Sequence, residues 1–104
     1  MFIEKLLTFF CKENETDNKK YPSEFALEAE LERKAGNCEV ALAAINKALK
    51  SEKDNDMFYI TRALIYKAQN DFKSALADIE KALRLNPNVE KTKTIQKEIL
   101  EEFK

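Results

Sequence analysis

The fold is decided by residues 56–89, whose sequence is DMFYITRALIYKAQNDFKSALADIEKALRLNPNV. Shifted back by 34 positions, this stretch aligns with residues 22–55, PSEFALEAELERKAGNCEVALAAINKALKSEKDN, and eight positions are identical. The identical pairs are Ala29 and Ala63, Ala41 and Ala75, Leu42 and Leu76, Ala43 and Ala77, Ile45 and Ile79, Lys47 and Lys81, Ala48 and Ala82, and Leu49 and Leu83. Self-similarity at this period is typical of repeat proteins, in which each unit stacks on the next. We therefore expect two equivalent units.

Each unit is expected to form two antiparallel helices joined by a short turn. Apolar residues recur at helical spacing on both sides of Gly36-Asn37, and this dipeptide aligns with Asn70-Asp71 in the second unit. Because the chain has one Gly and two Pro, and is rich in Ala, Leu, Glu and Lys, we predict an all-α fold, an α-α superhelix of two helical hairpins. In the first unit the apolar pattern consists of Phe25, Ala29, Leu31, Ala41, Leu42, Ile45, Ala48 and Leu49.

Small residues recur where the two helices of a hairpin are expected to cross. Two helices approach closely only where a methyl group replaces a larger side chain at the crossing. Ala75→Leu should therefore overpack the second hairpin, whereas Ala77→Leu lies on a face expected to be exposed and should cost little. The six alanines assigned to the crossings are Ala29, Ala41, Ala48, Ala63, Ala75 and Ala82.

The composition argues against several classes of function. The 18 basic and 19 acidic residues are interspersed and give a net charge of −1, so nucleic acid is not expected as a partner. There is no His, and Cys11 and Cys38 are far apart in sequence, so neither a zinc cluster nor a Cys-His nucleophile is predicted. Since no glycine-rich phosphate loop accompanies the carboxylates either, we expect neither a cofactor nor an enzyme.

The cysteines and the N-terminus also suggest a compartment. Two cysteines that are not expected to pair, and a Met-Phe-Ile-Glu-Lys start without a basic region or a small-residue cleavage site, are typical of a protein that stays in a reducing cytoplasm. We therefore predict a cytoplasmic location.

Residues 56–89 resemble a tetratricopeptide repeat. The resemblance rests on Tyr59, Ala63, Tyr66, Phe72, Ala75, Ile79, Ala82 and Pro87, which fall at the family's offsets. Residues 22–55 are similar but more degenerate, sharing Phe25, Ala29, Gly36, Ala41, Ile45 and Ala48. They place Glu32, Cys38 and Lys53 where the second unit has Tyr66, Phe72 and Pro87. The resemblance implies a first repeat at 22–55 and a second at 56–89.

The resemblance also implies a non-catalytic scaffold or adaptor that binds a protein or peptide on the concave face, lined by the first helix of each unit. On that face Met57, Ile60 and Leu64 form an apolar stripe that would suit an amphipathic helix laid in a groove. The same spacing also fits packing inside the core, and this alternative stays open. The candidate partner-binding residues, including the basic side chains expected to meet an acidic rim, are Glu30, Arg33, Lys34, Met57, Ile60, Leu64 and Lys67.

Residues 90–104 are predicted to form a capping helix. Apolar residues fall on one helical face, with Glu and Lys on the other, and the terminal unit of a stack needs such a cover. A helix that binds a partner is the alternative. The residues of the stripe are Thr92, Ile95, Gln96, Ile99, Leu100 and Phe103.

Residues 1–21 are predicted to comprise an apolar amphipathic helix and a polar linker. The apolar density of residues 2–11 requires burial, yet the segment is too short to span a bilayer and has a poor basic face, so membrane attachment is not favoured. The linker would let the helix dock on its own repeats, on a second copy of the chain or on another protein. The residues expected to dock are Phe2, Ile3, Leu6, Leu7 and Phe10.

Three functions remain open from the sequence. The first is an adaptor whose groove binds an amphipathic segment of another protein, with the N-terminal helix as its occupant or lid. The second is a self-associating, homodimeric structural module, because two repeats are fewer than the three that stability usually requires. The third is a membrane-peripheral assembly factor that uses residues 2–11.

Overall fold

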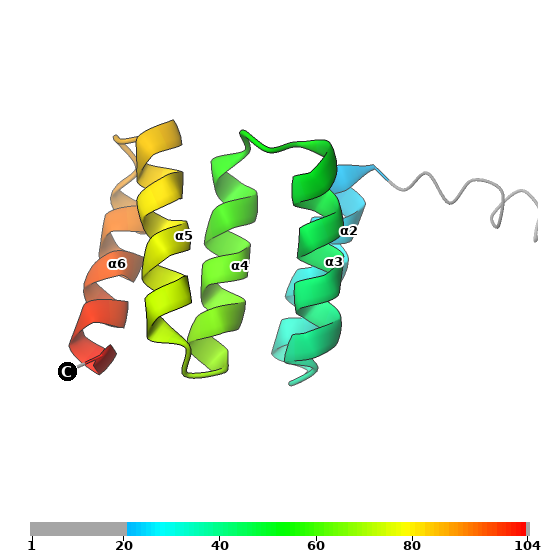
Figure 1. Ribbon diagram of the computed structural model, residues 1–104, viewed down its shortest axis with the longest axis horizontal. Helices are drawn as coiled ribbons and strands as arrows, with labels where there is room; N and C mark the ends of the chain where they lie inside the picture. The colour runs from blue at the N-terminus through cyan, green and yellow to red at the C-terminus, as the bar shows by residue number, and fades with distance from the viewer. Residues whose placement is uncertain (1–20, 104) are drawn as a thin grey trace, which may run out of the picture.

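A computed structural model describes residues 21–103, which form five α-helices (Figure 1). They are α2 (Pro22–Lys34), α3 (Cys38–Ser51), α4 (Asp56–Ala68), α5 (Phe72–Leu85) and α6 (Glu90–Phe103). Within these residues there is no strand, so the predicted all-α fold is confirmed. The proposed docking residues Phe2, Ile3, Leu6, Leu7 and Phe10 lie outside the described part of the chain.

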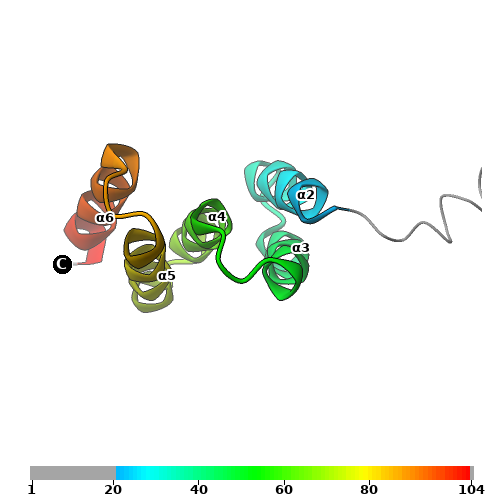
Figure 2. The same ribbon diagram turned by 90° about the horizontal axis from the view of Figure 1, so that it is seen from above.

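The helices form two hairpins that stand side by side, with α6 at one end of the row and α2 and α3 at the other (Figure 1). Seen from above, α2, α4 and α6 lie on one side, and α3 and α5 lie on the other (Figure 2). The main contacts between hairpins join α3 to α4, with a smaller contact between α2 and α4, and α6 packs on α5. The molecule is therefore a short helical row with two distinct sides.

The two hairpin turns have the same backbone geometry. Gly36 and its counterpart Asn70, 34 residues later, both have positive φ, 88° and 61°. In the first turn the N–H of Asn37 donates to the carbonyl of Glu32 at 2.8 Å, and in the second the N–H of Asp71 donates to the carbonyl of Tyr66 at 2.9 Å. These bonds cap the last carbonyls of α2 and α4 in the manner of a Schellman motif. The register of the repeat thus extends to the turn conformation.

Small residues occupy the hairpin interiors. All six alanines predicted at the crossings have an exposed fraction of 0%, whereas Ala77 is exposed, as predicted. The core divides into two clusters, one centred on Ile45 between the hairpins and one centred on Ile79 between α4, α5 and α6. Close packing of backbones at the alanines explains how helices of about four turns build a core from few large side chains.

Two parts of the apolar pattern are less buried than the sequence suggested. Leu31 is 61% exposed, although its counterpart Ile65 is fully buried. On α6, Thr92, Ile95 and Ile99 are buried, but Leu100 and Phe103 remain 46% and 49% exposed. Both differences occur at the ends of the row, because there the described part of the chain provides no further helix to pack against.

A polar cluster joins α4 to both neighbouring helices. The guanidinium of Arg62 donates to Asp78 on α5 through Nε and Nη2, at 2.8 and 2.7 Å, and through Nη1 to Asn46 on α3 at 3.0 Å. It also lies over the ring of Tyr59, 5.5 Å from its centroid. Asp78 is only 6% exposed, and its hydrogen bond is the main cause that raises the pKa of Arg62 above the ordinary value. Pairing of this kind holds three helices in fixed register.

Candidate protein-binding groove

A groove runs between α2 and α6, and α4 forms its floor. Its volume is about 420 Å³. Figure 2 shows the reason for its position, since α4 is set back between α2 and α6 on the same side of the row. The residues that line it are Glu30, Arg33 and Lys34 from α2, Met57, Ile60, Thr61 and Leu64 from α4, and Val89, Lys91, Thr92 and Ile95 from the start of α6 and the residue before it. We call this surface the α4 groove.

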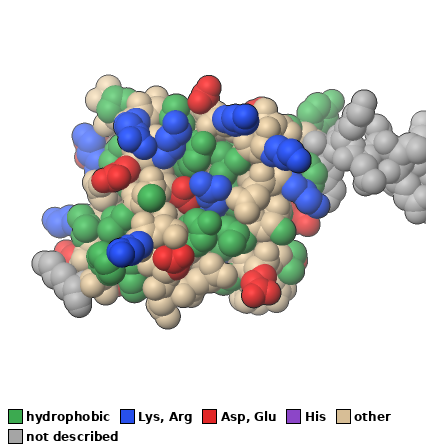
Figure 3. All heavy atoms as spheres, viewed as in Figure 1, with side chains coloured by type: hydrophobic (Ala, Val, Ile, Leu, Met, Phe, Trp, Pro, Cys, Tyr) green, Lys and Arg blue, Asp and Glu red, His purple; other side chains and the backbone are tan. Residues whose placement is uncertain are grey.

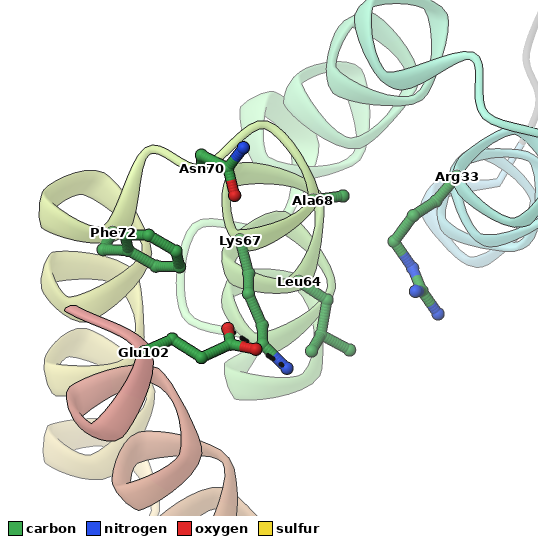
Figure 4. Close-up of a pocket in the computed structure, with 7 residues that line it drawn as sticks. All are labelled: Arg33, Leu64, Lys67, Ala68, Asn70, Phe72 and Glu102. Atoms are coloured by element: carbon green, nitrogen blue, oxygen red, sulfur yellow. Dashed lines mark ion pairs between the residues drawn. The ribbon is translucent and has the colours of Figure 1, made fainter. Parts of the chain in front are cut away.

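The structure brings six of the seven candidate binding residues to the α4 groove. They are Glu30, Arg33, Lys34, Met57, Ile60 and Leu64. The seventh, Lys67, lines an adjoining hollow of about 650 Å³, which shares Arg33 and Leu64 with the groove (Figure 4). The two hollows therefore form one continuous surface along α4.

The apolar stripe on the floor of the groove is not uniform. Met57 is 56% exposed and Leu64 is half-buried, so both offer apolar surface. Ile60 is 7% exposed and packs in the same cluster as Ile95 and Ile99 of α6. For Ile60 the alternative of core packing is thus the better description, because α6 covers it.

The charged residues around the groove are partly paired. Arg33 Nη2 lies 2.9 Å from Glu30 Oε2, and Lys67 Nζ lies 3.8 Å from Glu102 Oε2 on α6 (Figure 4). Lys34 and Lys91, at the mouth of the groove, are exposed and form no ion pair with another described residue. The cationic rim predicted from Arg33, Lys34 and Lys67 is therefore composed mainly of Lys34 and Lys91.

Two buried polar atoms beside the groove lack hydrogen-bond partners. Within residues 21–103, the buried side-chain atoms without a partner are Arg33 Nε and Thr92 Oγ1, and both residues line the groove. Buried polar groups are nearly always hydrogen-bonded, to protein atoms or to water, so both atoms keep hydrogen-bonding capacity beside the groove.

The sequence did not indicate the contribution of α6. Val89, Lys91, Thr92 and Ile95 complete one wall of the groove, although residues 90–104 were predicted to cap the stack, with a partner-binding helix as the alternative. The signal available in the sequence was the early position of Thr92 and Ile95 in the amphipathic stripe, next to Lys91.

The opposite side of the row, formed by α3 and α5 in front of α4, mixes charges of both signs with apolar groups (Figure 3).

Paired antiparallel helices stacked in a row, with an open groove along one side, define a helical repeat protein. Residues 58–89, which span nearly all of α4 and the whole of α5, match the family model of the tetratricopeptide repeat. Residues 58–89 are therefore similar to a tetratricopeptide repeat, as their sequence predicted, and the match supports a module for protein–protein interaction of a kind that is typically non-catalytic. The family model does not extend to α2 and α3, so the assignment of residues 22–55 as a first repeat stays a prediction. A comparison with curated proteins found no match.

Proposed function

We propose that the chain is a scaffold or adaptor that binds an amphipathic helical segment of another protein in the α4 groove. The observation that carries this proposal is the convergence of six candidate residues, three each from α2 and α4, on one open groove, in which Ile60 belongs to the core beneath the floor. Residues 30 and 64 are 34 positions apart, so they occupy equivalent places in the two units, and both line the groove. The two units thus contribute one pair of equivalent positions to the surface.

The surface favours a helix with an apolar face and an acidic flank. Met57 and Leu64 are seven residues apart, two turns of α4, and they match apolar side chains at i and i+7 of a helix lying along the groove. Lys34 and Lys91 stand on opposite walls and would meet acidic side chains at either edge of that helix. Charge complementarity of this kind contributes more to specificity and association rate than to affinity.

Other features bear on the remaining alternatives. Exposed apolar residues at the two ends of the row, Leu31 on α2 and Leu100 on α6, would also support stacking of copies, and the homodimeric module therefore stays the second candidate. Among residues 21–103, no helix has the length and apolarity needed to cross a membrane. Cys38 is a free thiol, and the cytoplasmic location stays a prediction.

Selection of peptides tests the proposed function. The full-length chain is used to select binders from a library of amphipathic helical peptides, and the affinity of each is then measured for Met57→Asp and for the control Ala77→Asp. Loss of an apolar contact that anchors an interface costs about 2 kcal/mol or more, so Met57→Asp should weaken binding by at least about tenfold. Ala77 is exposed on α5, away from the groove, and its variant should bind normally.

Equal affinity of the two variants, or a selection that yields no binder, would contradict the groove as the binding surface. Reversal of the charge at the rim, in Lys34→Glu with Lys91→Glu, gives a second check. It should reduce the affinity for acidic peptides and make that affinity less dependent on salt, because exposed charge pairs are screened by ions.

A further inference from the structure

The outer face of α2 exposes apolar residues that are covered in the equivalent helix of the second unit. Leu27 and Leu31 are 62% and 61% exposed. Their counterparts 34 residues later, Thr61 and Ile65, are 9% and 0% exposed. Since residues four apart lie on one face of a helix, Leu27 and Leu31 form a single apolar strip. We call it the α2 strip.

The reason for the difference is what lies beside each helix. Ile65 on α4 packs in the cluster that contains Ile45 and Ala48 of the preceding helix, α3. Thr61, one turn earlier, lines the α4 groove, and its hydroxyl donates to the carbonyl of Met57. For α2, the first described helix at its end of the row, no described element stands in the corresponding place (Figure 2). The geometry of the stack thus defines a position beside α2 that is equivalent to the position of α3 beside α4.

We propose that residues 2–11 of the same chain occupy this position and cover the α2 strip. Their sequence, FIEKLLTFFC, places Ile3, Leu6, Leu7 and Phe10 at the spacing of one helical face, and its charges, Glu4 and Lys5, cancel. A neutral apolar segment matches an apolar strip, whereas the α4 groove carries a basic rim and suits an acidic partner. The groove is therefore left free for another protein.

The length of the connection fits this placement. Ten residues, 12–21, join the segment to α2, and they span up to about 33 Å when extended. The helix α2 has 13 residues and is about 20 Å long. The connection is thus long enough for the segment to lie along α2 in this position, either antiparallel or parallel to it.

The tether also decides between the same chain and a second copy. A short linker holds the segment near the strip at an effective concentration in the millimolar range, which exceeds ordinary working concentrations of the protein. Docking within one chain is then favoured unless the linker cannot reach, and the lengths above show that it can. The segment acts as the missing cover of the N-terminal end.

A single fluorescent probe tests the proposal on the full-length chain. The chain contains no Trp, so Phe10→Trp introduces one indole whose emission reports its burial. We expect a blue-shifted emission that is independent of protein concentration. The combined change Leu27→Asp and Leu31→Asp should abolish the blue shift, and it should leave the helical circular dichroism unchanged because both residues are exposed in the described fold.

Matched variants separate the other possible occupants. Leu100→Asp changes an equally apolar, exposed site at the opposite end and should leave the emission unchanged. Any of three results would overturn the proposal. The first is an emission typical of solvent-exposed indole in the Phe10→Trp chain. The second is a blue shift that Met57→Asp abolishes and the combined Leu27→Asp and Leu31→Asp change does not. The third is a blue shift that appears only as the mass in solution doubles. The last two would assign the segment to the α4 groove and to a second copy of the chain, respectively.

Discussion

Replacing Ala75 with leucine should destabilise the protein, and the same change at Ala77 should not. The Ala75 side chain is fully buried in the cluster that joins α4 to α5, where Ala63 and Ile79 are also fully buried. Leucine adds three carbon atoms to a site with no free surface, and overpacking of this kind costs about 1 to 3 kcal/mol. For a domain of this size, a cost of about 2 kcal/mol lowers the melting temperature by roughly 8 to 16 °C.

Ala77 lies two residues away on the same helix and is exposed. Both changes replace alanine with leucine in the interior of α5, so the small difference in helix propensity is common to both and cancels in the comparison. The measurement is urea and thermal unfolding followed by far-ultraviolet circular dichroism. Surface substitutions usually change the free energy of unfolding by less than about 0.5 kcal/mol. Equal stabilities of the two variants would refute the assigned register of α5 against α4.

Further substitutions test the polar cluster and the turns. Asp78→Ala leaves the guanidinium of Arg62 without its main partner and should cost about 3 kcal/mol in urea unfolding, whereas the exposed neighbour Glu80→Ala should be neutral. Because folding raises the pKa of Arg62, its stabilising contribution is complete at neutral pH and is lost only when strongly alkaline pH passes the folded-state pKa. The difference in unfolding free energy between Asp78→Ala and the unmodified protein should therefore stay constant around neutrality. Gly36→Ala places a side chain at a φ of 88° and should cost about 1 kcal/mol or more. Asn70→Gly, at a φ of 61°, should be neutral or stabilising. The opposite order of melting temperatures would contradict the turn geometry.

The parts of the fold that recur with the period of 34 could be predicted from the sequence. The burial of the alanines at the crossings and the turn conformation at Gly36 and Asn70 depend on contacts within one hairpin, so they are the same in both units. Leu31 shows where this reasoning ends. Its counterpart Ile65 is buried by the preceding hairpin, and a terminal unit has no such neighbour among the described residues. Burial at the end of a stack depends on position in the row as well as on the repeat.

The candidate groove could be predicted only in part for a related reason. Its α2 and α4 residues follow from the repeat, but residues 90–104 have no second copy to indicate where α6 would lie. The burial of Ile60 and the pairing of Lys67 with Glu102 both depend on that placement. The Arg62–Asp78 pair was missed because its partners are 16 residues apart on different helices, and the first unit has Glu28 and Ala44 at the equivalent positions.

A nuclear magnetic resonance titration of the full-length chain with a selected amphipathic peptide tests the groove most directly. The backbone amides of α2, α4 and α6 that surround Met57 and Leu64 should show the largest changes in chemical shift, and those changes should saturate together with binding. Amides on the outward faces of α3 and α5, including that of Ala77, should change little. Changes concentrated on α3 and α5 instead would contradict the α4 groove as the surface that binds the partner.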